Sequence, residues 1–206
     1  MKATIRALLV LIVAVSAIVG VAAYSVVSRG LSARDEPSRL EATVARAMRR
    51  WATPQSQRTR SNPVQPTEPV LEQALEHFAD HCAGCHGNDG SGNTEMGRGF
   101  YPKAPDMRAA QTQSLTDGEL FSIIEHGIRL TGMPAWGTGT PEGERDSWGL
   151  VHFVRRLPAL TPDDIERMEA LNPKTPAQLK EEEEIRQFLQ GGPDNSTPSP
   201  SHTGHN

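Results

Sequence analysis

The chain has 206 residues, of which 36% are hydrophobic, and it contains 16 prolines, 18 glycines and two cysteines. So little apolar content with so much Pro and Gly favours one small domain with additional segments over two full-sized domains. The net charge of -4 is uneven, with ten Lys and Arg against three acids up to Arg60 and a surplus of acids from residue 71 onwards. The basic residues flank an apolar segment instead of covering a folded face, which excludes a nucleic-acid-binding function.

A long uncharged segment follows the N-terminus. Between Arg6 and Arg29 lie 22 residues without a charge, which as a helix span roughly 33 Å, close to the thickness of a bilayer core. We interpret residues 1–28 as a transmembrane anchor. The alternative is a cleaved signal peptide, since the small residues at 21–23 resemble a cleavage site, although the apolar region is longer than is usual in signal peptides.

Residues 29–52 are expected to form an amphipathic helix next to the membrane. Leu40, Val44, Met48 and Trp51 recur at helical spacing, with arginines around them. Such a helix can lie in the lipid headgroup layer, pack its apolar stripe on another membrane subunit, or only space the domain from the bilayer. The sequence leaves these three roles open.

A proline-rich segment, residues 53–69, separates this helix from the compact unit. It is poor in apolar residues and is predicted to be a semi-extended linker. The compact unit, residues 70–160, begins with apolar residues at intervals of four and three from Leu71 to Phe78. They predict a helix that runs into residues 82–87.

The rest of the compact unit is predicted to alternate between loops and helices. Residues 87–110 are rich in Gly and Pro, and a loop of that length in a small domain indicates something to wrap around. Thr116 resembles an N-cap for a helix that ends at Gly127, and a second loop leads to a last core helix at residues 141–157.

Beyond the compact unit, residues 161–190 are predicted to form an acidic extension of two short helices. Each opens with a Thr-Pro pair, whose hydroxyl caps the helix. Residues 191–206 are predicted to be a disordered tail. His202 and His205 in this tail are possible weak copper or nickel ligands, but two histidines in a disordered end are more often only solvated.

The strongest chemical signal is the sequence CAGCH at residues 82–86. It matches the pattern for attachment of c-type haem, in which two thiols reach the vinyl groups of one haem edge and the next imidazole comes under the iron. Cys82 and Cys85 are therefore predicted to bind one haem c covalently, with His86 as the proximal iron ligand. A thioredoxin-like pair lacks its strand-helix-strand context, a zinc site lacks a second ligand pair, and a structural disulfide leaves very little core.

The second axial ligand decides whether the iron transfers electrons or reacts with a bound molecule. Met133 is the predicted ligand, because it lies 47 positions after His86, which is enough chain to pass around a haem. It also lies in Gly-Met-Pro, a turn sequence, and not on a helical stripe where a core methionine is expected. Met107 is the second choice, Met96 and His126 are further competitors, and a methionine that only covers the core is the structural alternative.

With these features, residues 71–158 resemble the single-haem class I cytochromes c of bacteria. The likeness comprises a helix entering CAGCHG, a Pro-containing loop, a helix, a Gly-Met-Pro loop and a closing helix that ends in Val-Arg-Arg-Leu-Pro. It implies a small all-α fold wrapped around one haem. It further implies that the first and last helices cross, with Phe78 against Trp148 or His152.

The resemblance also implies a hydrogen bond that orients the proximal histidine. A carbonyl near a loop proline, here Pro102 or Pro105, is expected to accept from Nδ1 of His86. The sequence does not favour one proline over the other.

The expected function is that of an electron carrier and not of an enzyme, since two protein ligands leave no iron position for a substrate. It passes single electrons between redox proteins on the periplasmic side of the bacterial inner membrane, held there by one membrane span. The alternative is a fixed electron-entry subunit of a respiratory dehydrogenase or terminal oxidase, and a haem sensor or peroxidase is a third reading. Because the domain is acidic, partners are expected to dock through a basic patch.

Overall fold

The computed structural model of the chain describes residues 2–30 and 32–189. Within these ranges all regular secondary structure is helical, as predicted, and no strand occurs. The N-terminal half contains α1 (Lys2–Arg29), α2 (Arg39–Ala52), α3 (Gln55–Arg58), α4 (Glu68–His77), the π-helix η1 (Phe78–Cys82), α5 (Ala83–His86) and α6 (Glu95–Gly99). The C-terminal half contains α7 (Ala110–Gln113), α8 (Asp117–His126), α9 (Pro141–Arg156), the short 3₁₀ helix η2 (Leu157–Ala159), α10 (Pro162–Leu171) and α11 (Pro176–Leu189).

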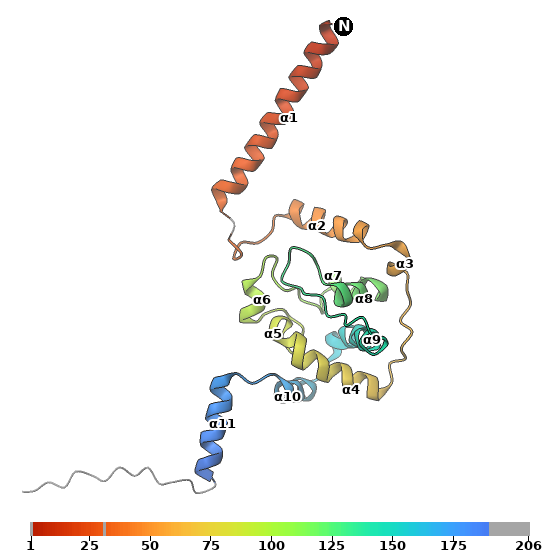
Figure 1. The fold of residues 1–206 in the computed structure, drawn as a ribbon, viewed down its shortest axis with the longest axis vertical. Coiled ribbons are helices and arrows are strands. Elements are labelled where there is room, and N and C mark those ends of the chain that lie inside the picture. Colours follow the sequence, from red (N-terminus) through yellow and green to blue (C-terminus); the bar gives the residue numbers. More distant parts are fainter. Residues whose placement is uncertain (1, 31, 190–206) are drawn as a thin grey trace, which may run out of the picture.

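Helix α1 extends away from the helical body (Figure 1). Its 26 residues from Ala3 to Ser28 have a mean hydropathy of 2.7, and none of its apolar length is buried against the rest of the described chain. Such a helix spans roughly 39 Å, which is long enough to cross a bilayer. The predicted apolar helix is therefore confirmed.

The core forms where α4 and η1 cross α9. Phe78 packs on Phe153 with ring centroids 4.9 Å apart, and both side chains are almost fully buried. The predicted crossing of the first and last core helices is thus present, but the ring that Phe78 contacts is neither Trp148 nor His152. Trp148 instead stacks on Phe121 of α8, with centroids 4.1 Å apart, because α8 fills the other side of α9.

Helix α8 begins as its sequence predicts. The hydroxyl of Thr116 accepts a hydrogen bond from the backbone N–H of Glu119, whose carboxylate accepts one from the backbone N–H of Thr116. This reciprocal capping satisfies two N–H groups that a helix start otherwise leaves unpaired. The helix ends at Gly127, which has a φ of 64°.

The proline-rich segment 53–69 lies along the helical body. Asn62 donates to the carbonyl of Trp148 at 2.9 Å, and Nε2 of His152 lies 2.8 Å from the carbonyl of Val64. The segment also contains the short helix α3, whose Arg58 carbonyl accepts from the hydroxyl of Thr116. The segment is mostly extended, as expected of a linker, but these contacts attach it to α8 and α9.

The two predicted C-terminal helices are present and differ in packing. Met168 of α10 is fully buried in the core, and Thr161 caps that helix through a reciprocal bond with Asp164. Helix α11 buries none of its residues and projects from the body on the side away from α2 (Figure 1). The predicted tail 191–206 lies outside the described residues.

Candidate functional site

The CAGCH sequence occupies the end of one continuous helical segment. Helix α4 widens into the π-helix η1, which ends at Cys82, and α5 carries Cys85 and His86. Gly87, with a φ of 74°, ends this segment, a backbone angle that favours glycine. π-helical turns are uncommon and occur frequently at functional sites, and this one directly precedes the motif.

His86 presents a buried imidazole nitrogen. Its Nδ1 atom is shielded from solvent and makes no hydrogen bond within ordinary geometric limits. Burial lowers the pKa of the imidazole, while the nearby backbone carbonyl of Pro105 raises it. Of the two loop prolines considered, Pro105 therefore supplies the carbonyl that faces His86, a position from which it can orient a metal-binding imidazole.

The two thiols are free and differ in environment. Burial raises the pKa of Cys82 to about 12, and it also raises the pKa of the more accessible Cys85. Both side chains are therefore protonated at neutral pH. The raised pKa values show that the motif lies in surroundings of low polarity.

The loop after His86 folds back and holds the motif. The hydroxyl of Thr94 donates to the carbonyl of Cys85 at 3.0 Å, and the N–H of Gly92 donates to the carbonyl of His86 at 2.7 Å. Gly97 lies so close that a Cβ there would stand 2.2 Å from the Cys85 carbonyl oxygen. The short helix α6, which sequence patterning did not reveal, thus interrupts the predicted long loop and packs on α5.

The loop that carries Met133 is fixed to α8. The carbonyl of Met133 accepts a hydrogen bond from the N–H of Ile128 at 3.0 Å, and the N–H of Trp136 donates to the carbonyl of Ile124 at 3.0 Å. Met133 itself is half-buried and lies outside any helix. The predicted ligand is therefore held on a constrained loop.

Two contacts bring this loop against the CAGCH segment and the loop that follows it. The indole of Trp136 meets the imidazole of His81, next to Cys82, edge to face at 5.4 Å. Gly132, next to Met133, lies against the ring of Phe100, where a Cβ would stand 2.5 Å from the nearest ring atom. The fold therefore brings together the two segments that carry the predicted axial ligands.

The competing ligands lie in other environments. Met107 is buried in the hydrophobic core, with its backbone N–H bonded to Gly90. Met96 is 57% exposed, and its sulfur lies 3.3 Å from that of Cys85. His126 is exposed at the end of α8. In the part of the chain that the structure describes, no group of three or more His, Cys, Asp or Glu side chains is arranged to hold a metal ion.

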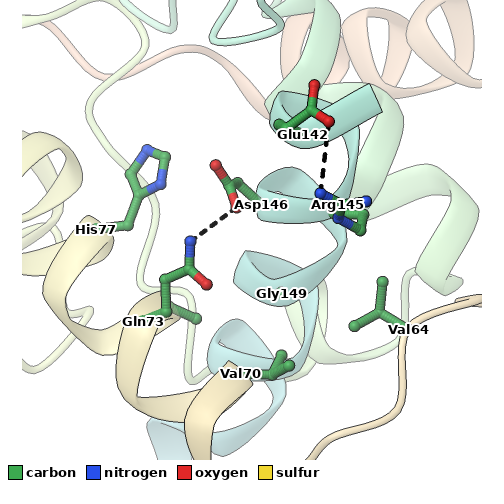
Figure 2. Close-up of a pocket in the computed structure, with 9 residues that line it drawn as sticks. Val64, Val70, Gln73, His77, Glu142, Arg145, Asp146 and Gly149 are labelled. Atoms are coloured by element: carbon green, nitrogen blue, oxygen red, sulfur yellow. Dashed lines mark hydrogen bonds and ion pairs between the residues drawn. The ribbon is translucent and has the colours of Figure 1, made fainter. Parts of the chain in front are cut away.

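A separate pocket of about 240 Å³ lies between α4 and α9 (Figure 2). It is lined by Val64, Val70, Gln73, Ala74, His77, Glu142, Arg145, Asp146 and Gly149. Its polar groups largely pair with one another, with Gln73 donating to Asp146 at 3.0 Å (Figure 2). The pocket is smaller than the roughly 300 Å³ at which ligand sites begin, and it contains none of the predicted haem ligands.

Comparison with known proteins places the motif in a family. The sequence model described as cytochrome c oxidase, cbb3-type, subunit III matches residues 70–154. The cbb3-type cytochrome c oxidase subunit FixP of Sinorhizobium medicae (strain WSM419) is 39% identical over 77 residues, and that of Rhizobium meliloti (strain 1021) is 36% identical over 77 residues. Each match covers 34% of this chain and 23% of the relative, so the chain spans about a quarter of the length of these curated relatives.

The cofactor of this family is haem c with its iron, and the buried imidazole, the free thiol pair and the adjoining methionine loop fit that group. The all-helical fold and the apolar helix α1 agree with the match. The similarity of residues 70–154 and the apolar helix α1 thus support the resemblance of this chain to membrane-anchored class I cytochromes c.

Proposed function

We propose that this chain is the electron-transferring cytochrome subunit of a respiratory terminal oxidase. The observation that carries the proposal is the coincidence of CAGCH, a buried proximal imidazole and an adjoining methionine loop within the segment that matches the oxidase subunit. Both relatives are named as oxidase subunits, which supports the subunit reading over the membrane-anchored carrier between separate redox proteins that the sequence first suggested.

Four residues would hold one haem c in the cytochrome domain. Cys82 and Cys85 would bind its vinyl groups through thioether bonds. His86 would be the proximal ligand, oriented by the carbonyl of Pro105. Met133 would be the second axial ligand, presented by the loop that α8 holds in place.

The residues of the chain that would hold the haem determine which chemistry it can support. Bound haem supplies a one-electron iron couple. His86 and Met133 would both hold the iron of this group and would leave no iron position for a substrate, so we expect the subunit to be a non-catalytic electron carrier. A methionine ligand raises the potential relative to two histidines, which suits delivery to an oxidase.

The membrane arrangement follows from charge. Lys2 and Arg6 precede the apolar segment, which favours a cytoplasmic N-terminus and a periplasmic cytochrome domain on a single span of the inner membrane. Residues 71–160 carry seven basic against twelve acidic residues. The electron donor is therefore expected to dock through a basic patch, and the association should slow as salt rises.

Purification of the chain from its native membranes tests the subunit assignment. Mild detergent extraction should recover it in a stoichiometric complex with large oxidase subunits, and deletion of the chain should abolish oxygen consumption by that complex. Recovery as a lone cytochrome, with oxidase activity unchanged after deletion, would restore the reading as an anchored carrier between separate redox proteins. Carbon monoxide binding by the reduced native protein would instead favour a sensor or peroxidase.

A further inference from the structure

Two sides of helix α2 have different surroundings. Toward the helical body, Glu41 accepts a hydrogen bond from the hydroxyl of Tyr101, and Glu36 just before the helix pairs with Lys103. Arg49 is half-buried; burial lowers its pKa, and the charge of Glu119 in α8 raises it. The hydrogen bonds of Glu36 and Glu41 attach the N-terminal end of the helix to the cytochrome domain.

The side of the helix away from Arg49 carries an exposed apolar stripe. Leu40, Val44, Met48 and Trp51 lie four, four and three residues apart and so share one side of the helix. Leu40 is 75% exposed and Trp51 is 82% exposed. Four large apolar side chains aligned in this way expose a surface that a soluble protein normally covers.

A row of unpaired cations runs beside the stripe. Arg39, Arg46 and Arg50 lie seven and four residues apart, which aligns them on one flank of the helix. All three are exposed, and within the described ranges none of them forms an ion pair. An apolar stripe with a cationic flank complements the acyl and headgroup layers of an anionic bilayer.

The position of α2 brings this surface to the membrane. The helix begins at Arg39, ten residues after α1 ends at Arg29, so its start lies at most about 36 Å from the membrane-spanning helix. Figure 1 shows α2 lying across the side of the helical body from which α1 extends. Tryptophan is also enriched at membrane interfaces, which suits the position of Trp51 on the stripe.

We propose that α2 lies in the surface of an anionic membrane, with its apolar stripe in the acyl boundary and its arginine row against lipid phosphates. Because Tyr101 and Lys103 belong to the loop between α6 and α7, the helix thereby fixes the orientation of the cytochrome domain relative to the bilayer. This role is independent of whether the chain belongs to an oxidase.

Cysteine accessibility in the full-length haem-containing chain tests the proposal. The chain is inserted through α1 into nanodiscs of phosphatidylcholine with phosphatidylglycerol, and in parallel into discs of phosphatidylcholine alone. A cysteine is introduced by Val44→Cys in the stripe or, as a matched control, by Glu181→Cys on the projecting helix α11. The rate of reaction with a water-soluble maleimide is measured, and the chain without an added cysteine reports any reactivity of Cys82 and Cys85.

We expect Val44→Cys to react on the order of tenfold more slowly than Glu181→Cys in the anionic discs. Each arginine near an anionic surface contributes about a fivefold change in binding, so replacement of Arg39, Arg46 and Arg50 by Gln should remove the protection. Far-UV circular dichroism checks that this variant keeps its fold.

Three results would overturn the proposal. In the first, Val44→Cys and Glu181→Cys react equally fast in the anionic discs. In the second, protection is equal in discs without phosphatidylglycerol, so lipid charge plays no part. In the third, Val44→Cys is protected only in native membranes that contain other subunits, which assigns the stripe to a protein partner.

Discussion

Helices α2 and α9 both carry apolar residues at helical spacing, but they bury them differently. Trp148 and Val151 of α9 are 1% and 0% exposed, whereas Leu40 and Trp51 of α2 are 75% and 82% exposed. The apolar face of α9 is covered by α4 and α8 of the same chain, while that of α2 faces away from the chain. An amphipathic pattern therefore shows that a helix has a nonaqueous neighbour, and only the fold shows whether the chain itself provides it.

The largest expected effect distinguishes the buried apolar face of α9 from the exposed apolar stripe of α2. Phe153→Ala should lower the free energy of unfolding by about 3–5 kcal/mol, because it opens a cavity beside Phe78. Trp51→Ala, which removes an even larger aromatic side chain, should change it by less than about 0.5 kcal/mol. Denaturant unfolding of the detergent-solubilised chain, followed by circular dichroism, measures both. Equal losses would mean that the chain itself covers the stripe of α2.

The two loop methionines sharpen the same comparison. Met107→Ala should cost about 2–5 kcal/mol of stability, since its partners are core side chains, and it should leave the iron ligands in place. Met133→Ala should instead open an axial position, so that the reduced protein binds carbon monoxide. Optical titration with carbon monoxide distinguishes them, and binding by the Met107 variant alone would make Met107 the ligand.

A comparison of two glycines of α6 tests close packing on the backbone of the motif, and its expected effect is smaller. Gly97→Ala places a Cβ against the Cys85 carbonyl, whereas a Cβ at Gly99 meets nothing within 4 Å. The first substitution should cost about 1–3 kcal/mol and reduce the yield of chain with attached haem. The second should do neither. Haem-stained yield and thermal unfolding of the two variants provide the measurement, and identical behaviour would argue against close packing of α6 on the motif.

The smallest effect concerns a charge that is paired within the chain. The pKa of Asp164 lies below its ordinary value, chiefly because its carboxylate accepts a hydrogen bond from the backbone N–H of Thr161. The hydroxyl of Thr161 and the charge of Arg156 lower it further. Since the unfolded chain then takes up a proton first, this stabilisation is present above about pH 4 and is lost as the pH falls through the lower, folded pKa. Asp164→Asn should flatten the fall in unfolding temperature over that acid range. An unchanged acid profile would contradict the assignment.

The sequence predicted the parts of this molecule that depend on local pattern. The capped start of α8 at Thr116, its end at Gly127 and both Thr-Pro helix starts are present, because capping uses atoms within a few residues. The CAGCH motif was recognisable for the same reason, since its chemistry lies in five consecutive residues.

Features that depend on distant contacts were missed or left open. Phe78 packs on Phe153 because α8 occupies the side of α9 that carries Trp148, an arrangement that no local pattern encodes. The choice of Pro105 over Pro102 and the contact of Trp136 with His81 likewise arise from how the loops close on the motif. The sequence of α6, Glu-Met-Gly-Arg-Gly, gave no periodic signal, because a helix of five residues is too short to show one.

The central claim is that one haem c is covalently bound at Cys82 and Cys85. Acidified organic extraction of the purified, exported chain, followed by a pyridine haemochrome assay and mass spectrometry of the peptide around residues 82–86, tests it most directly. The account predicts one haem per chain that stays with the polypeptide and is carried by that peptide. A colourless chain, or pigment released into the solvent, would contradict it.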